Sequence, residues 1–134
     1  RAENVSTNEV GEVLNLHPQI SMANVYGVEV PGVEGRAGMV AFELEEGAEL
    51  DLAAFLSLVE HELPSYAQPI FIRILKLAET TVTFKLLKGD LREQAFHLAK
   101  VGGDTLYVRK PRGNSYEMLD VEFYQHLVAG TSGY

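Results

Sequence analysis

Residues 39–64, MVAFELEEGAELDLAAFLSLVEHELP, carry the pattern that decides the fold. Val40, Phe42 and Leu44 recur at every second position and predict a strand over 39–44. After a turn at 45–47, apolar side chains recur at helical spacing; they are Leu52, Phe55, Leu56, Val59 and Leu63. This second repeat predicts an amphipathic helix that begins after Asp51, its N-cap, and ends before Pro64. A strand followed by such a helix indicates a sheet with helices packed on it.

The remaining segments extend this pattern in both directions along the chain. We expect further helices over 7–16, about 88–99 and 121–128, the last capped by Asp120, and further strands over 23–30, 70–75 and 106–109. Residues 126–134 are expected to form a loose tail. A length of 134 residues predicts one domain over residues 1–134. Together these expectations give a small α+β domain whose sheet of short strands carries the helices on it.

Composition excludes several classes of function. The chain has no cysteine, which excludes disulfides, thiolate catalysis and zinc–cysteine sites. Its four histidines follow no metal-binding spacing, so we expect no metal site. A net charge of −8 argues against nucleic acid as a partner. No apolar run approaches the roughly 20 residues that a membrane helix needs.

The charge is unevenly distributed. Residues 1–63 contain 12 acidic and 2 basic residues, whereas residues 64–134 contain 7 acidic and 9 basic ones. Five of the basic residues fall between positions 73 and 92; they are Arg73, Lys76, Lys85, Lys88 and Arg92. This basic stretch predicts the place where a polyanionic ligand would meet the chain. The alternative is a solvated face of a helix and its loops.

The start of the chain resembles an interior segment of a longer protein. Ser6 and Glu9 have the spacing of a capping box at the beginning of a helix. We therefore expect an upstream domain or linker in the natural protein, the alternative being a processed or engineered terminus.

Residues 80–85, TTVTFK, are the strongest candidate for chemistry in the sequence. A hydroxyl-rich loop that ends in lysine presents an ammonium group on a flexible stem to a phosphate or a carboxylate. A β-turn with an exposed lysine is the alternative.

Six segments resemble the C-terminal domain of acyl-CoA ligases in the adenylate-forming superfamily, in the branch of fatty acid transport proteins and very-long-chain acyl-CoA synthetases. They are RAENVSTNEV (1–10), ANVYGV with PGVEGRAGM (23–28 and 31–39), LPSYAQP (63–69), TTVTFK (80–85) and LYVR (106–109). Their order is that of the family, and the resemblance covers residues 1 to about 125.

The resemblance implies a fold, an activity and a set of site residues. It implies the mobile C-terminal domain of an enzyme that uses ATP and Mg²⁺ to adenylate a fatty acid and then transfers the acyl group to CoA. Lys85 would be the catalytic lysine, supported by a loop containing Thr81, Thr83 and Phe84. Residues 1–6 would be a post-hinge segment, in which Arg1, Ala2, Glu3 and Asn4 line the pantetheine channel.

The resemblance also implies partners and a location. The N-terminal adenylation domain of the same polypeptide would hold ATP and the fatty acid, so this chain would be inactive alone. The enzyme would be cytoplasmic, or associated with a membrane surface through the missing part. Val82 and Ala2 stand where the family usually has glycine, which leaves a second hypothesis open, a non-catalytic binding or regulatory module of the same fold.

Overall fold

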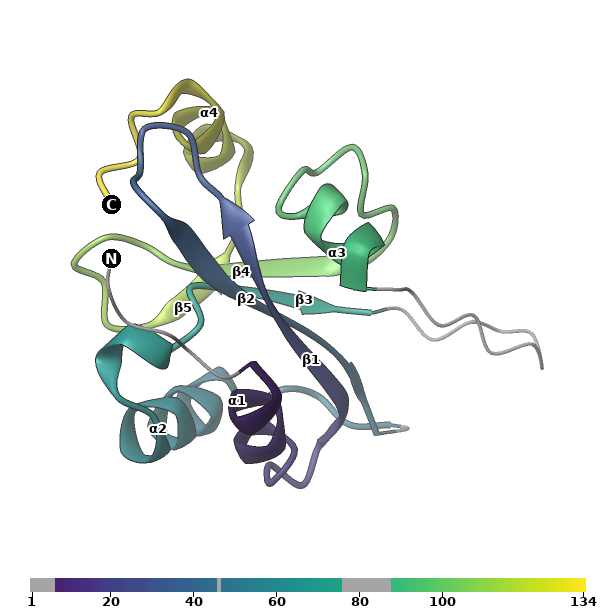
Figure 1. The fold of residues 1–134 in the computed structure, drawn as a ribbon. Helices are drawn as coiled ribbons and strands as arrows, with labels where there is room; N and C mark the ends of the chain where they lie inside the picture. The colour runs from purple at the N-terminus through teal and green to yellow at the C-terminus, as the bar shows by residue number, and fades with distance from the viewer. Residues whose placement is uncertain (1–6, 46, 76–87) are drawn as a thin grey trace.

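A computed structural model describes residues 7–45, 47–75 and 88–134, and it contains a mixed five-stranded sheet in the order β1-β2-β3-β4-β5 (Figure 1). The strands are β1 (Ile20–Glu29), β2 (Arg36–Leu44), β3 (Phe71–Ile74), β4 (Thr105–Arg109) and β5 (Tyr116–Met118). The helices are α1 (Thr7–Leu14), α2 (Leu52–Glu62), α3 (Lys88–Gln94) and α4 (Val121–Ala129). A 3₁₀ turn covers Ser65–Ala67.

Pairing within the sheet follows the connections. β1 and β2 form an antiparallel hairpin, in which Val25 lies opposite Val40. The crossover through α2 makes β3 parallel to β2, whereas β4 and β5 return antiparallel. β3 therefore lies in the centre of the sheet, with a neighbour on each side.

Helices α1 and α2 cover one face of the sheet (Figure 1). Val10 and Leu14 of α1 pack with Phe55 and Val59 of α2, and with Phe42 of β2, all of them buried. The apolar face of α2 that the spacing of residues 52–63 predicts is therefore the face that packs against the sheet. Asp51 is the N-cap of α2, because its side chain accepts a hydrogen bond from the amide of Ala54 at 3.1 Å.

Helices α3 and α4 cover the opposite face (Figure 1). Leu91 and Phe96, in and after α3, pack with Leu127 of α4 over Met39 and Phe71 of the sheet. The rings of Phe71 and Phe96 stack with their centroids 5.0 Å apart. The expected α+β domain is confirmed, and both faces of its sheet are covered by helices.

Besides shifts of a few residues at element ends, three larger differences from the expectations lie in the second half of the chain. The helix expected over 88–99 ends at Gln94, because Ala95 adopts a left-handed φ of 42° that interrupts the helical backbone. β5 was not expected; it is a short edge strand with two of its three side chains exposed. The tail expected to be loose is helical through Ala129, and Tyr134 packs against the domain.

No helix among the described ranges is both long and apolar enough to cross a membrane.

Candidate functional site

The sequence places its site residues in two segments that both lie outside the described residues. They are Lys85 with Thr81, Thr83 and Phe84, and Arg1, Ala2, Glu3 and Asn4. The structure does describe the elements on either side of the segment that carries Lys85. β3 precedes this segment and α3 follows it. The geometry of the candidate site is therefore built from β3, α3 and the contacts that join them.

Arg73 is the side chain that joins these elements. It lies in β3, whose sequence FIRI alternates between the two faces of the sheet, so Phe71 and Arg73 share the face covered by α3. Its register neighbours are Ala41 in β2 and Leu106 in β4. The small side chain of Ala41 leaves space on this face, and Arg73 is buried with 3% of its surface exposed.

The guanidinium of Arg73 contacts two polar partners from distant parts of the chain. Its Nε and Nη2 both lie 2.8 Å from Oδ2 of Asp104, which comes just before β4. Its Nη1 donates a hydrogen bond to Oε1 of Gln94, the last residue of α3, at 2.5 Å. A buried charge is tolerated only when it is paired and hydrogen-bonded in this way. We name the three residues the Arg73 clamp.

The end of β3 is held by the backbone as well. The amide of Leu75 donates to the carbonyl oxygen of Phe42 in β2 at 2.9 Å, so pairing with β2 continues past the last residue of β3. On the other side, Leu91 anchors α3 in the core with 1% of its surface exposed. The two elements that flank residues 76–87 are therefore fixed to the same sheet.

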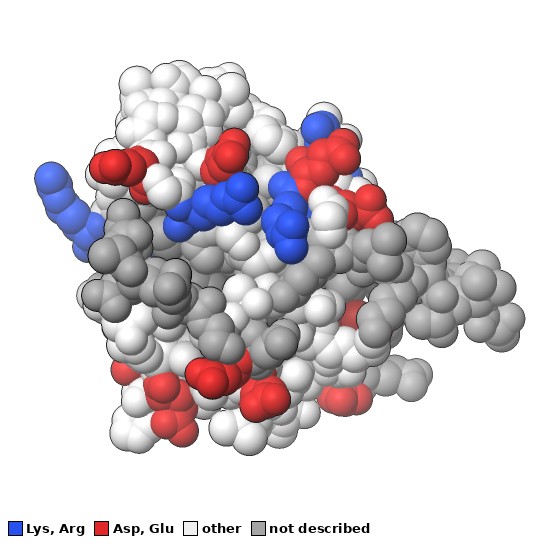
Figure 2. All heavy atoms as spheres, in the orientation of Figure 1, with Lys and Arg blue, Asp and Glu red and all other residues white. Residues whose placement is uncertain are grey.

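Only part of the predicted basic stretch, which runs from Arg73 to Arg92, is exposed to solvent where it could contact an anion. Arg73, which belongs to it, is buried in the clamp and is not offered to solvent. Arg92 is exposed and lies with Arg36 at a shallow depression beside α3. On the face shown in Figure 2, acidic side chains alone lie over α1 and α2, whereas both signs occur over the upper half.

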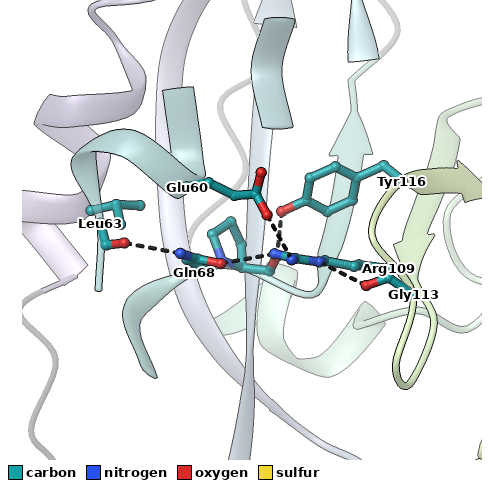
Figure 3. Close-up of polar contacts among 7 residues, drawn as sticks. Glu60, Leu63, Gln68, Arg109, Gly113 and Tyr116 are labelled. Atoms are coloured by element: carbon teal, nitrogen blue, oxygen red, sulfur yellow. Dashed lines mark hydrogen bonds and ion pairs between the residues drawn. The ribbon is translucent and has the colours of Figure 1, made fainter. Parts of the chain in front are cut away.

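A second arginine ties together the opposite side of the sheet (Figure 3). Nη2 of Arg109 in β4 pairs with Glu60 of α2 at 3.1 Å, and Nη1 donates to Oε1 of Gln68 at 2.8 Å. Its Nε donates to the carbonyl oxygen of Gly113 at 3.3 Å. Gln68 in turn donates to the carbonyl oxygen of Leu63. Arg109 thus joins β4 to α2 and to Gln68, the residue that caps the 3₁₀ turn.

Tyr116 completes this second network. Its hydroxyl donates to the carbonyl oxygen of Pro69 at 2.5 Å, and burial raises the pKa of the phenol above its ordinary value. The tyrosine therefore stays neutral and acts as a hydrogen-bond donor that holds the loop before β3 against β5.

A cavity of about 470 Å³ opens between the β1–β2 hairpin and residues 65–70. Tyr66, Tyr134 and Arg36 are among its lining side chains, and so is Thr7, which directly follows the predicted post-hinge segment. The cavity combines apolar walls with a few polar groups, as small-molecule sites do. Among the residues that the structure describes, no three His, Cys, Asp or Glu side chains form a group that could hold a metal ion.

Sequence reasoning missed the Arg73 clamp, although one signal was present. A charged residue within the otherwise apolar strand FIRI has to be either at an edge or paired. Its partners Gln94 and Asp104 lie 21 and 31 residues further along the chain, so the pairing becomes visible only once the strand order is known.

Curated relatives resemble nearly the whole chain. It is 43% identical over 129 residues to long-chain fatty acid transport protein 6 of Mus musculus, covering 96% of this chain and 21% of that protein. It is 39% identical over 120 residues to the very long-chain fatty acid transport protein of Cochliobolus heterostrophus, covering 87% of this chain and 18% of that protein. The chain therefore spans about a fifth of the length of these relatives.

Solved structures share the fold. Coronafacic acid ligase from Pectobacterium brasiliense matches with a TM-score of 0.64 at 17% identity, over 81% of this chain and 20% of that one. The family model of the AMP-binding enzyme C-terminal domain matches residues 9–85, and its match ends on Lys85. Because this match covers more than half of the chain, the protein belongs to the AMP-binding enzyme C-terminal domain family.

Proposed function

We propose that this chain is the C-terminal domain of an ATP-dependent fatty-acid–CoA ligase and that Lys85 is its adenylation lysine. The observation that carries the proposal is the family match over residues 9–85, which includes the TTVTFK segment and its final lysine. The names of the relatives support a long-chain or very-long-chain fatty acid as the substrate class. Thr81, Thr83 and Phe84 would support the lysine from the same loop.

Adenylation brings a fatty-acid carboxylate against the α-phosphate of ATP, and these two anions repel each other. An ammonium group aimed at both oxygens lowers this repulsion and stabilises the charge that develops in the transition state. We assign ATP, its Mg²⁺ and the acyl chain to the N-terminal adenylation domain of the same polypeptide. The chain alone would then be inactive, and the two domains together would exclude water from the acyl-adenylate.

The second half-reaction would use the other predicted segment. Arg1, Ala2, Glu3 and Asn4 would line the channel through which the CoA thiol reaches the acyl-adenylate. A methyl group at Ala2, where the family usually has glycine, would narrow that channel. We expect Ala2→Gly in the full-length enzyme to raise the rate of thioester formation, and an unchanged rate would contradict this role.

The test of the proposal separates the two half-reactions in the full-length enzyme. Lys85→Ala is expected to lower pyrophosphate release from ATP and fatty acid by about 10²- to 10³-fold. Thioester formation from ready-made acyl-adenylate and CoA should persist. Lys100→Ala is the matched control, because Lys100 is an exposed lysine in the turn that follows α3. It should leave both rates unchanged.

A non-catalytic module of the same fold is the second candidate, and Val82 is the observation that favours it. A β-branched residue resists the positive φ that glycine adopts. If Lys85→Ala leaves both half-reactions intact, the lysine has no part in the chemistry and the module hypothesis is preferred. The whole enzyme is expected in the cytoplasm or on a membrane surface, through parts outside this chain.

A further inference from the structure

The Arg73 clamp joins β3 and α3, the two elements that flank the Lys85 segment, and ties both of them to the entry of β4. Arg73 lies two residues before Leu75, the last described residue ahead of the segment, and Gln94 closes the helix that follows it. Asp104 fixes the same guanidinium to the entry of β4. One side chain thus links β3, α3 and β4 at a single point on one face of the sheet.

A buried guanidinium is a costly way to achieve stability alone. An apolar residue of similar volume would fill the space between Ala41, Leu106 and α3 at least as well, because replacing a buried ion pair by packed apolar groups is often neutral or stabilising. An apolar side chain, however, makes no directional hydrogen bonds. The guanidinium holds its N–H donors in a rigid plane, so it can donate to both Asp104 and Gln94 only when these two acceptors lie in one relative placement.

We propose that Arg73 is a positioning residue for Lys85, an inference that rests on the proposed function. By holding β3, α3 and β4 in one arrangement, it sets the two anchor points between which the lysine has to reach the substrate. Displacement of a reacting group by about 1 Å costs on the order of 10²-fold in rate. Loss of the directional hydrogen bonds of Arg73 is therefore expected to lower the rate of adenylation.

Arg109 provides a matched control within the same sheet. Like Arg73, it is an arginine in a strand of the sheet that contacts one carboxylate and one glutamine, here Glu60 and Gln68, although it is more exposed than Arg73. Its partners belong to α2 and to the 3₁₀ turn, so it fixes neither end of the Lys85 segment. Replacing either arginine by lysine removes a planar set of N–H donors, but only the replacement of Arg73 does so next to the elements that flank the Lys85 segment.

The experiment compares Arg73→Lys, Arg109→Lys and Lys85→Ala in the full-length enzyme, with both half-reactions measured separately. Arg73→Lys keeps the charge but loses the rigid fork, and we expect it to lower adenylation by about 10- to 100-fold. Thioester formation from ready-made acyl-adenylate should change by less than about twofold, since it does not use the lysine. Arg109→Lys should leave the ratio of the two rates unchanged.

A double variant separates positioning from a general loss of structure. If Arg73 acts through Lys85, Arg73→Lys should cause no further loss of adenylation in the Lys85→Ala background. Equal losses in both half-reactions, or full additivity with Lys85→Ala, would overturn the inference while leaving the proposed function intact. Normal adenylation by Lys85→Ala would instead overturn the proposed function.

Gln94→Met provides a second variant in case Arg73→Lys does not fold. It removes one hydrogen bond of the clamp and leaves the ion pair with Asp104 in place. Gln94→Met is expected to lower adenylation selectively, but by a smaller factor than Arg73→Lys. In the Lys85→Ala background it should cause no further loss of adenylation. Unchanged half-reactions in a folded Gln94→Met enzyme would count against a positioning role of the clamp.

Discussion

The hydroxyl of Tyr134 donates a hydrogen bond to the backbone carbonyl oxygen of Arg109, and this contact fastens residue 134 to β4. The ring of Tyr134 packs edge-on against Phe71 and Phe123, with centroids 6.5 and 6.2 Å apart. Burial raises the pKa of this phenol above its ordinary value, so it remains a donor throughout the neutral range. The last residues of the chain are thus part of the packed domain.

Tyr134→Phe and Tyr134→Ala separate the hydrogen bond from the ring. Tyr134→Phe is expected to lower the free energy of unfolding by about 1 kcal/mol, the usual net value of one hydrogen bond. Tyr134→Ala also removes the ring and should cost about 2–3 kcal/mol, less than for a fully buried aromatic residue. Urea denaturation of this chain measures both. Equal stability of the wild type and Tyr134→Ala would show that the tail contributes nothing.

Two glycines in the β1–β2 connection allow a clean test of backbone strain against steric contact. Gly32 and Gly35 adopt left-handed φ values of 79° and 76°. A Cβ on Gly32 would lie 2.6 Å from the carbonyl oxygen of Gly130, where the hairpin tip meets the end of α4 (Figure 1). A Cβ on Gly35 would meet nothing within 4 Å.

Gly35→Ala is expected to cost about 1–2 kcal/mol of unfolding free energy, the penalty for a left-handed L-residue. Gly32→Ala should cost at least about 1 kcal/mol more, because the methyl group also forces the hairpin away from Gly130. Thermal or urea unfolding of the two variants side by side gives the difference. Equal destabilisation would mean that the contact with Gly130 is absent in solution.

Local signals in the sequence predicted most of the elements. Asp51 and Asp120 cap α2 and α4 as expected, each accepting from the amide three residues ahead, a geometry that depends only on neighbours in the chain. β5 has no such signal, because a three-residue edge strand with two exposed side chains shows no repeat. Its one buried residue, Tyr116, belongs to a network that spans 47 residues.

The catalytic segment TTVTFK was predicted from its resemblance to the family. The Arg73 clamp, which holds the elements on either side of that segment, became visible only from the topology of the sheet. TTVTFK could be recognised because its residues are consecutive. The Arg73 clamp could not, since a charged residue in a strand reveals its partners only when β3 is placed between β2 and β4. The same charge was counted with the basic surface stretch, which shows that a sum of charges along a sequence does not tell which of them are buried.

The ion pairs of Arg73 and Arg109 should differ strongly in their contribution to stability. The side chains of Arg73 and Asp104 are 4% and 13% exposed, whereas those of Arg109 and Glu60 are 21% and 49% exposed. Asp104→Ala leaves a buried charge without this partner and is expected to cost about 3–5 kcal/mol of unfolding free energy. Glu60→Ala should cost about 1 kcal/mol or less. A smaller effect for Asp104→Ala than for Glu60→Ala in urea denaturation would refute the clamp as a buried pair.

His97 is expected to make the stability of the domain depend on pH near neutrality. Its Nδ1 lies 3.1 Å from the hydroxyl of Tyr124, its ring lies against Phe96, and burial followed by the nearby charge of Lys100 lowers its pKa below the ordinary value. Two further charged side chains, Arg92 and Glu93 of α3, line the shallow depression that His97 also lines. A histidine with a lowered pKa binds its proton more weakly in the folded state than in the unfolded state. The free energy of unfolding should therefore fall as the pH drops below the ordinary value of about 6.5.

His97→Gln is expected to remove part of this fall, because glutamine keeps a polar group near Tyr124 and carries no titrating proton. The measurement is urea denaturation at about pH 7.5 and about pH 5.5, above and below the ordinary histidine pKa. His61→Gln is the matched control, since His61 is exposed at the end of α2. The wild type and His61→Gln should lose more stability between these two pH values than His97→Gln does. If all three lose the same amount, the protonation of His97 is not coupled to folding, and its burial against Phe96 and Tyr124 does not persist in solution.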